Sequence, residues 1–551
     1  MIHVYRISLT EIALTVSVVW FLYKLHGRFS KKGLQTTPLN GPPNKSFIFG
    51  LYRHIQKSDD LGLVYEEWAT RYGPAFKVAG SFGTSQVVIC DPKANAHFYA
   101  KETYVYVQTK LSRVFVENLF GRGLLWSEGD SHKRQRKALS PAFSNAAIRK
   151  LTSVFYDSSY KMKAAWDSTI DASTVDTLID VQKWMDRIAL DSVGIAGFGH
   201  DFGSLDGHRS SVAEVFDMFG SADSSLISDI IFFLGPVLPV LQKLPTKRNK
   251  IFKQLRTNMG EIAEELLERT RREKEGIPMS EEKSIIGLLL KAENSSPDLQ
   301  ISQEEIIAQV VCIYSLSQIC LFSCTLWMQN VLLLAGYVTT SVSLTWALIE
   351  LCRKPEKQQK LRDELAEFAG TDPTFDQLAT GLPYLDGVVH EVLRLHPPVR
   401  ETTRVAAEDD LIPFSNPVIT ASGETITSIV IAKGTVVTSP ILHMNTCESF
   451  WGPDAREFEP ERWLKEELGP AKDIQGHRHL LTFSDGPRIC LGKSFALAEF
   501  KAVLSVLICN YTFELPDGPT TKIDNYASII PRPKLEGEIG ARLPLKVKRI
   551  N

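Results

Sequence analysis

Residues 483–492 read Phe-Ser-Asp-Gly-Pro-Arg-Ile-Cys-Leu-Gly and place an aromatic residue, two glycines, an arginine and a cysteine at fixed intervals. Cys490 stands just before the apolar stretch 491–507, which we expect to be helical. Its sulfur would then lie at the positive end of a helix dipole, which favours the anionic form of cysteine. The thiolate is the form that binds metal ions, so the pattern predicts that Cys490 is a metal ligand.

The neighbours of Cys490 suit a porphyrin. Gly486 permits a tight turn, and Gly492 allows backbone to approach a flat ring closely. Phe483 can shield the sulfur from water, and Arg488 can pair with a haem propionate. An anionic axial sulfur favours cleavage of the O–O bond, so the chemistry indicated is oxygen activation. A lone cysteine is more often a buried structural thiol, and only the complete pattern argues against that alternative.

The spacing Phe-x-x-Gly-x-Arg-x-Cys-x-Gly resembles the haem-binding signature of the cytochrome P-450 family, and the resemblance extends over residues 42–544. It implies haem b, with iron ligated by the thiolate of Cys490. The implied fold is mainly α with small β-sheets, preceded by an N-terminal membrane helix. The resemblance is to fungal, microsomal members, for which a role in secondary metabolism is expected.

A second motif pairs Glu391 with Arg394 on one face of an expected helix that ends at two prolines. An exposed pair of this kind would contribute only tenths of a kcal/mol. The stretch 458–462 resembles the family's Phe-x-Pro-x-Arg segment and adds Arg462. The resemblance implies that these three residues form a buried structural triad, because losing one member would leave the other charges without partners.

A third motif, at 126–137, resembles the helix on which the family binds haem propionates. Arg136 keeps the family's arginine, His132 stands where a tryptophan is usual, and Arg404 matches another propionate contact. The implied electron donor is NADPH-cytochrome P-450 reductase, with cytochrome b5 as a further candidate partner. Three neighbouring cations would receive that acidic partner or simply form a solvated face: Lys133, Arg134 and Lys137.

The oxygen-side motif lies at 335–341 and departs from the family pattern. Gly336 belongs to a small pair that leaves room for dioxygen, and Thr339 matches the family's proton-relay threonine. Val338 stands where an Asp or Glu is usual, so the carboxylate half of the relay is missing. Alone, Thr339 would be a helix threonine bonded to its own backbone. The departure leaves open a haem-thiolate isomerase, dehydratase or peroxygenase, or an inactive haem-binding membrane protein.

Residues 311–329 separate an expected helix start at 302–305 from the 335–341 motif. A helix that continued through them would displace the motif by several turns, so the start and Thr339 could not both keep their places. Codons for residues 311, 312 and 329 can carry fungal intron boundaries. We interpret 311–329 as a retained intron, with a second membrane segment as the alternative, since 306–349 is uncharged.

Composition and charge limit where in the cell the protein is expected and which partners it is expected to bind. The net charge of −2 and the absence of a long basic run argue against nucleic-acid binding. Residues 1–36 form an expected N-terminal membrane anchor with a basic flank, residues 37–45 a proline-rich hinge, and residues 46–551 the haem domain. A cleaved signal peptide is the alternative for the first segment. We expect a single-pass protein of the endoplasmic reticulum membrane, in contact with membrane lipid, with its catalytic domain in the cytosol.

Periodicity indicates a small sheet within 47–99 and then mostly helix. Helices are expected at residues 148–166, 175–196, 252–274 and 356–368. By family analogy an apolar small-molecule substrate would lie among residues 105–119, 336–340, 399–402 and 527–529. The expected reaction is a monooxygenation that inserts one oxygen atom of O2 with electrons from NADPH.

Overall fold

The structure is a computed structural model that describes residues 34–56, 58, 60–120, 122–173, 177–208, 250, 322–368 and 370–550. For residues 118–120, 198 and 322–334 it describes the backbone alone. Most of the expected anchor, the expected helix 252–274, the helix start at 302–305 and most of the 311–329 segment lie outside the described residues.

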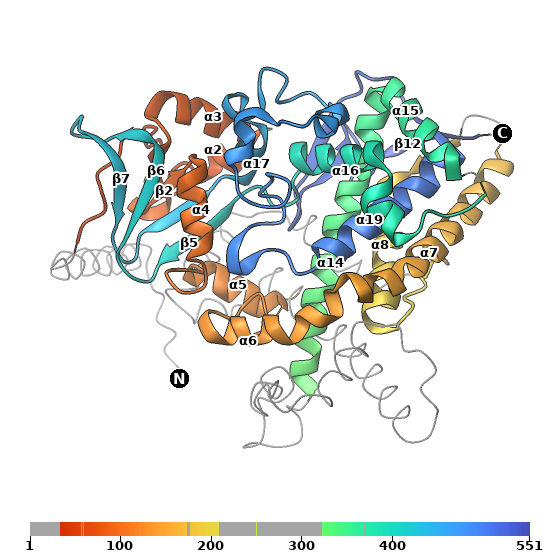
Figure 1. Cartoon of the computed structure of the whole chain (residues 1–551), viewed down its shortest axis with the longest axis horizontal. Helices are drawn as coiled ribbons and strands as arrows, with labels where there is room; N and C mark the ends of the chain where they lie inside the picture. The colour runs from red at the N-terminus through yellow and green to blue at the C-terminus, as the bar shows by residue number, and fades with distance from the viewer. Residues whose placement is uncertain are drawn as a thin grey trace, which may run out of the picture.

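A five-stranded sheet, on the left in Figure 1, forms one end of the molecule. Its strands run in the order β1 (Ala75–Ala79), β2 (Ser85–Ile89), β8 (Val436–Ser439), β5 (Thr402–Ala406) and β3 (Tyr106–Val107). β2 and β8 are parallel, while the other neighbours are antiparallel. Helices α2 (Tyr52–Gln56), α3 (Leu61–Tyr72) and α4 (Pro92–Ala100) lie at this end. The sheet therefore brings β5, and Arg404 on it, beside residues far away in the chain.

Three smaller sheets complete the β structure of the described residues. They are formed by β6 (Asp410–Ile419) with β7 (Thr425–Ile431), by β10 (Ile523–Tyr526) with β11 (Arg532–Leu535), and by β4 (Thr177–Asp180), β12 (Pro544–Arg549) and β9 (Tyr511–Glu514). The prediction of helix from residue 175 is wrong for β4. Its partner β12 comes from the end of the chain, so the pairing that makes 177–180 a strand is invisible to local periodicity.

Helices form the larger part of the described chain. They are α5 (Lys110–Phe120), α6 (Gly129–Leu139), α7 (Asn145–Asp171), α8 (Val181–Val193), α14 (Phe322–Arg353), α15 (Pro355–Leu365), α16 (Pro383–Leu395), α17 (Ile441–Thr446), α18 (Glu448–Trp451) and α19 (Lys493–Asn510). The helices predicted at 148–166 and 356–368 are confirmed, the second ending in a 3-10 turn, Ala366–Phe368. The predicted class, mainly α with small β-sheets, is confirmed.

Helix α14 runs through the middle of the molecule (Figure 1) and packs against α8, α16 and α19. Helix α19 is apolar on nearly all sides, and most of its residues are buried, as expected for a helix enclosed by other elements. These packed helices position the functional site. Among the helices of the described residues, none is both long and apolar enough to cross a membrane.

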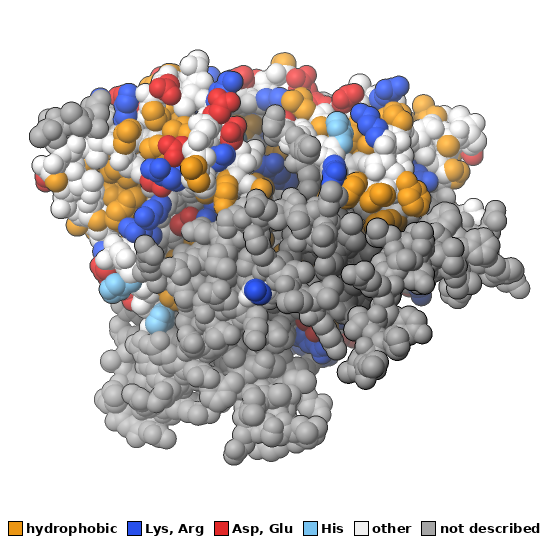
Figure 2. Space-filling view, turned by 180° about the vertical axis from the view of Figure 1, so that it is seen from behind, with side chains coloured by type: hydrophobic (Ala, Val, Ile, Leu, Met, Phe, Trp, Pro, Cys, Tyr) orange, Lys and Arg blue, Asp and Glu red, His pale blue; other side chains and the backbone are white. Residues whose placement is uncertain are grey.

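The described surface carries charges of both signs. On the face shown in Figure 2, Lys and Arg side chains alternate with Asp and Glu side chains, with hydrophobic side chains between them. This mixture agrees with the net charge of −2 for the whole chain. The described part of this face shows no extended area of one sign.

Candidate active site

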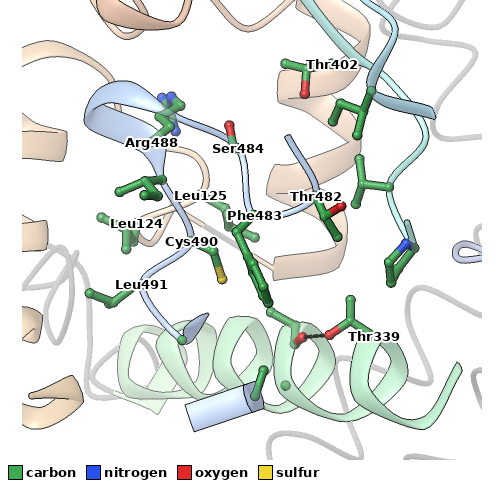
Figure 3. Close-up of a pocket in the computed structure, with 18 of the residues that line it drawn as sticks. Leu124, Leu125, Thr339, Thr402, Thr482, Phe483, Ser484, Arg488, Cys490 and Leu491 are labelled. Atoms are coloured by element: carbon green, nitrogen blue, oxygen red, sulfur yellow. Dashed lines mark hydrogen bonds between the residues drawn. The ribbon is translucent and has the colours of Figure 1, made fainter. Parts of the chain in front are cut away.

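A cavity of about 610 Å³ lies between α14 and the loop that carries Cys490 (Figure 3). Helices α5 and α6, strand β5 and the start of α19 supply its other walls. The side chains that meet there come from both halves of the chain: Val116, Leu124, Arg136, Thr339, Arg404 and Cys490 are examples. The fold thus brings the residues singled out at 132–136, 336–339, 404 and 483–492 to one cavity.

Local hydrogen bonds shape the loop around Cys490. The Cys490 N–H donates to the carbonyl of Phe483 at 2.8 Å, and the Ile489 N–H donates to the carbonyl of Gly486 at 3.1 Å. Gly486 has φ +63°, and a Cβ there would lie 2.3 Å from the Tyr99 carbonyl oxygen. Only glycine suits this turn, both for its conformation and for the close approach of α4.

The sulfur of Cys490 faces the cavity. The Cys490 side chain is exposed and lines the cavity, so the surface that it exposes includes the cavity wall. Burial raises the pKa of the Cys490 thiol, while the Gly492 N–H and the charges of Arg136 and Lys493 oppose that rise. The start of α19 therefore does not by itself produce a thiolate. A metal cation would, because coordination removes the thiol proton outright.

Cationic and neutral nitrogen groups meet at one edge of the cavity. Arg136, Arg404, Arg488 and His132 all line it. His132 is buried at 3% exposure, and its pKa is lowered to about 4 by burial and by the charges of Arg488 and Arg136. The imidazole is therefore neutral at neutral pH and can donate one N–H.

Two carboxylates, missed by the sequence reasoning, hold two of these arginines. Arg488 Nη2 donates to Glu128 Oε2 and to the Ser127 carbonyl, each at 2.5 Å. Arg404 Nε lies 2.8 Å from Glu102 Oε1, an ion pair whose angle falls outside hydrogen-bond geometry. Glu102 is fully buried, and its pKa is raised by burial against the opposing charge of Arg404. Nothing in the local sequence marks these acids, because their partners lie in other elements.

Thr339 lies on the α14 side of the cavity (Figure 3), and its hydroxyl donates to the Ala335 carbonyl at 2.6 Å. The donor is therefore engaged, while the oxygen can still accept a hydrogen bond from a group in the cavity. A Cβ on Gly336 would lie 2.9 Å from Cγ2 of Val193 on α8, so glycine here also permits close packing of two helices. Val338 is buried at 3% exposure and provides no polar group.

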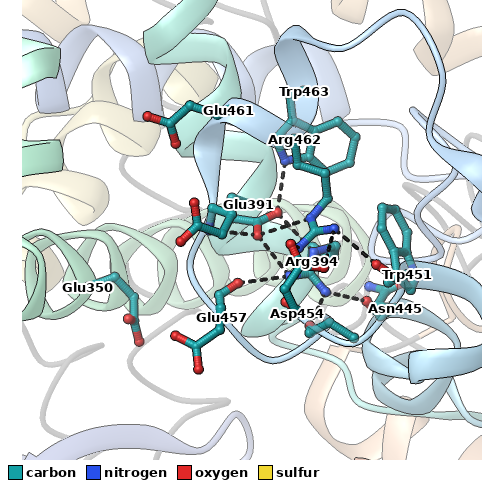
Figure 4. Close-up of polar contacts among 12 residues, drawn as sticks. Glu350, Glu391, Arg394, Asn445, Trp451, Asp454, Glu457, Glu461, Arg462 and Trp463 are labelled. Carbon is teal, nitrogen blue, oxygen red and sulfur yellow. Dashed lines mark hydrogen bonds and ion pairs between the residues drawn. The ribbon is translucent and has the colours of Figure 1, made fainter.

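Behind the Cys490 loop, Glu391, Arg394 and Arg462 form a buried polar cluster (Figure 4). Arg394 binds Glu391 through two hydrogen bonds, at 2.8 and 2.9 Å, and Arg462 Nε lies 3.5 Å from Glu391 Oε1. Arg462 makes closer contact with Asp454, at 3.0 Å. Trp463 donates to Glu391 at 2.9 Å, so the cluster contains partners beyond the three predicted residues.

The expected substrate region lies only partly at this cavity. Residues within 105–119, 336–340 and 399–402 line it, among them Gln108, Ser112, Thr340, Val399 and Thr402. Residues 527–529 contribute no side chain to its lining. Strand β10, which precedes these residues, instead lines a second, more polar cavity of about 860 Å³.

Comparison with known proteins decides the family. The sequence profile described as cytochrome P-450 matches residues 40–315 and 328–538. The chain belongs to the cytochrome P-450 family. It is 59% identical to cytochrome P-450 monooxygenase claP of Ampulloclitocybe clavipes over the full length of both chains. It is 60% identical to claO of the same fungus, over 97% of this chain and 96% of claO, and 32% identical to monooxygenase 205 of Postia placenta, over 98% and 97%.

This similarity over the full chain identifies the protein as an oxidoreductase, a haem-dependent cytochrome P-450 monooxygenase. The residues present fit haem. The Nε atom of Arg488 is buried without a hydrogen-bond partner among the described residues, beside a cavity that also exposes a sulfur. A Cβ on Gly492 would meet only the Phe143 ring, at 3.9 Å, so space for a flat ring remains beside the backbone. The cytochrome P-450 match also skips residues 316–327, which fall within 311–329.

Proposed function

We propose that the protein is a haem-thiolate monooxygenase in which Cys490 is the iron ligand and an apolar small molecule is the substrate. One observation carries the proposal: the Cys490 sulfur faces a cavity whose opposite wall, on α14, presents Thr339. When bound, thiolate-ligated haem supplies activation of dioxygen, so that one oxygen atom enters a C–H or C=C bond. The chain's own residues would hold the haem, shield the Cys490 sulfur from water and orient the substrate.

The predicted residues around the cavity would each contribute one group to haem binding. Cys490 Sγ ligates the metal, and Phe483 shields it from water. Arg136, Arg404 and Arg488 supply guanidinium groups for the propionates, and His132 supplies a neutral N–H. Glu102 and Glu128 hold two of these guanidinium groups in place. Because the arginines already meet carboxylates, the site limits excess positive charge at this edge.

The lining of the cavity supports an apolar substrate. Val116, Leu124, Leu125, Val399 and Ile441 line it, with a smaller number of hydroxyl and amide groups between them. Small-molecule sites commonly combine such walls with a few polar groups that orient the ligand. A screen of terpenoids, sterols, fatty acids and aromatics for spectral shifts of the haem tests the class. Shifts given by charged, polar compounds alone would contradict it.

Electrons would come from NADPH through a separate reductase, with cytochrome b5 as a second donor. Lys133, Arg134 and Lys137 are exposed on α6, the helix that also carries His132 and Arg136. Cations beside a buried redox group steer an acidic partner towards it. Location in the endoplasmic reticulum membrane, through residues 1–36 in contact with lipid, belongs to the same proposal. Cell fractionation with and without residues 1–36 tests that location.

A carbon monoxide difference spectrum of the reduced protein tests the central proposal. The long-wavelength band of a thiolate-ligated haem is expected for the wild-type protein. Its replacement by the shorter-wavelength band of a neutral ligand would overturn the assignment of Cys490. NADPH consumption with reductase then distinguishes turnover from haem binding without turnover.

A peroxide-using enzyme is a second candidate, favoured by the absence of an acid at Val338. Such an enzyme takes its oxygen atom from hydrogen peroxide, which already carries the protons that must otherwise be delivered when dioxygen is reduced. The two functions separate when one substrate is offered with reductase and NADPH, or with hydrogen peroxide alone. Product from peroxide alone, without product from NADPH, would favour the second candidate.

We also propose that residues 311–329 are absent from the working protein. The interruption of the family match at 316–327 supports this. Sequencing of the transcript provides the test. Reads that join Val310 directly to Asn330 are expected, whereas abundant unspliced messages together with an active full-length protein would contradict the proposal.

A further inference from the structure

The segment 398–401 is a wall shared by the cavity at Cys490 and the second, more polar cavity. Pro398 lines both cavities. After it, Val399 and Glu401 line the cavity at Cys490, whereas Arg400 lines the second one. Neighbouring side chains of an extended segment point to opposite sides, which is how one stretch of chain can serve two cavities. Arg400 thus lies outside the cavity at Cys490, although it belongs to the predicted region 399–402.

The charged side chains of the second cavity are mostly paired with one another. The pairs are Arg353 with Glu350 at 3.0 Å, Lys354 with Glu457 at 3.5 Å, Arg456 with Asp60 at 3.2 Å and Lys522 with Glu536 at 3.7 Å. Arg400 is the exception among these arginines and lysines, because it forms no salt bridge within the described residues. The charge of Asp60 reaches it, but Asp60 already binds Arg456. Asp524, on β10, is an exposed acid of the lining that has no ion pair in the described part of the chain.

The guanidinium of Arg400 is half-buried and has unused donors. Its Nη2 donates to Asn525 Oδ1 at 3.1 Å, and it forms no other hydrogen bond with the described residues. A guanidinium has five N–H donors and stays charged at neutral pH. Burial lowers the pKa of Arg400, and the charge of Asp60 opposes this only in part. A cation that has lost hydration without gaining a carboxylate favours an anion from solution, above all a carboxylate that accepts two parallel hydrogen bonds.

The same cavity offers a flat apolar surface. Trp346 on α14 and His396 at the end of α16 stack, with ring centroids 3.8 Å apart and an interplanar angle of 3°. Glu350 holds the His396 ring, because its Oε1 lies 3.0 Å from His396 Nε2. Further apolar side chains line the cavity: Val342, Leu395, Pro397, Leu442, Phe458 and Ile523. Small-molecule sites combine such walls with a few polar groups, so this lining suits a ligand that carries both a ring and a negative charge.

We propose that the second cavity binds a small aromatic carboxylate through Arg400, and that this ligand alters substrate affinity in the cavity at Cys490. The ring of the ligand lies against the apolar walls that include Trp346. Segment 398–401 transmits the effect, because a shift of Arg400 towards an anion also moves Val399 and Glu401, which line the other cavity. The two ligands then change each other's affinity by the same factor. The effect on substrate rests on the proposed function, whereas binding at Arg400 does not.

Fluorine NMR of para-fluorobenzoate, titrated with the haem-loaded full chain, tests the site directly. Saturable binding is expected for the wild type, and Arg400→Gln should weaken it by about tenfold or more, the range for a lost charge-assisted hydrogen bond. Arg353→Gln is the matched control, because it removes a positive charge from the same cavity, but from a guanidinium that Glu350 already binds. Its affinity should stay close to that of the wild type. The thiolate band and the unfolding temperature of both variants show whether the fold is intact.

Further probes define the chemistry of the ligand. Para-fluorobenzyl alcohol lacks the charge and trifluoroacetate lacks the ring, so both should bind more weakly than para-fluorobenzoate. Trp346→Leu should reduce the affinity for para-fluorobenzoate and leave that for trifluoroacetate unchanged. Inorganic phosphate at equal concentration should not displace para-fluorobenzoate.

Phenylimidazole, whose ring nitrogen binds haem iron, measures the coupling without a known substrate. Its affinity, followed by the absorbance of the haem, should change by about fivefold or more at saturating para-fluorobenzoate. The affinity for para-fluorobenzoate should change by the same factor at saturating phenylimidazole. In Arg400→Gln both changes should disappear.

Equal affinity of the wild type and Arg400→Gln for para-fluorobenzoate would overturn the proposal, as would an equal loss in Arg353→Gln or displacement by phosphate. Unchanged affinity for phenylimidazole at saturating para-fluorobenzoate would overturn the effect on the cavity at Cys490. If the wild type itself lacks the thiolate band, the proposed function fails, and the fluorine titration still reports whether Arg400 binds the anion.

Discussion

The two walls of the cavity are built in different ways. The wall that carries Cys490 is a short loop closed by its own hydrogen bonds, from Cys490 to Phe483 and from Ile489 to Gly486. The wall on α14 is a helix whose contacts come from α8 and α19, far away in the chain. A loop of the first kind appears in the sequence as a compact motif, whereas the second depends on packing. The family pattern is complete in the first wall and departs at Val338 in the second.

Replacing Cys490 should have the largest effect and should leave the α14 wall intact. Cys490→Ser removes the sulfur, so the thiolate band and monooxygenase activity are expected to disappear. Cys509→Ser, at a cysteine exposed on the far end of α19, is the control and should keep both. The carbon monoxide difference spectrum and product formation measure the outcome. Retention of the thiolate band in Cys490→Ser would show that another cysteine is the ligand.

The cluster behind the Cys490 loop should account for a large part of the stability. Arg394→Ala removes the bidentate cationic partner of the fully buried Glu391 carboxylate and leaves three backbone carbonyl groups without that donor, and should cost about 3–5 kcal/mol of unfolding free energy. Arg149→Ala removes an exposed partner of Asp376 and should cost under about 1 kcal/mol. Urea unfolding of both variants provides the comparison. Equal losses would mean that the buried cluster is no stronger than a surface ion pair.

One glycine in each wall of the cavity offers a further comparison of the two walls, because the two alanine variants should have different effects. Gly336→Ala should lower the unfolding free energy by about 1 kcal/mol, because overpacking against Val193 exceeds the gain of alanine in a helix. Gly492→Ala places its Cβ in ordinary contact with the Phe143 ring alone, so stability should change little while haem retention falls. Unfolding and the ratio of haem to protein measure the two effects. A destabilised Gly492→Ala with normal haem content would reverse this assignment.

Acid should weaken the scaffold of the Cys490 side in a small, defined step. Burial opposes ionisation of Glu461, but hydrogen bonds from Lys360 and Lys357 lower its pKa to about 2, from an ordinary value of 4.5. A lowered pKa in the folded state stabilises above pH 4.5, and this contribution is lost as the pH falls towards 2.

After allowance for its partial exposure, this loss should be about 1 kcal/mol. The unfolding free energy of the wild type and of Glu461→Gln, compared between about pH 6 and pH 3, measures it. The two curves should converge as the pH falls. Parallel curves would show that Glu461 contributes no pH dependence.

Local motifs predicted most of the Cys490 side. Short stretches of sequence predicted the turn at Gly486 and the pairing of Glu391 with Arg394, and the resemblance to the family implied that Arg136 and Arg404 lie at the haem. The structure places both arginines in the lining of the cavity. The partners of these residues did not follow from those stretches. Glu102, Glu128, Asp454 and Trp463 gain their meaning only from contacts with other elements, and a lone glutamate in a sequence does not show which arginine it will meet.

The same limit applies to the elements themselves. Strand β4 was expected to be helix because its partner β12 lies at the other end of the chain. Helices α7 and α15 were predicted well, because a helix makes its hydrogen bonds within itself and shows its buried face as periodicity. Strands depend on distant partners, so local pattern describes them less well.

The sequence by itself determined the family, the mainly helical class, the haem motif around Cys490 and the missing acid at Val338, because each is written in neighbouring residues. Only the tertiary structure decided that Glu499, a residue that the sequence motifs did not single out, is fully buried on α19, and that burial raises the pKa of its carboxyl. The physical reason is that burial sets the charge state of a carboxyl, and burial is a property of packed helices rather than of any single stretch of chain.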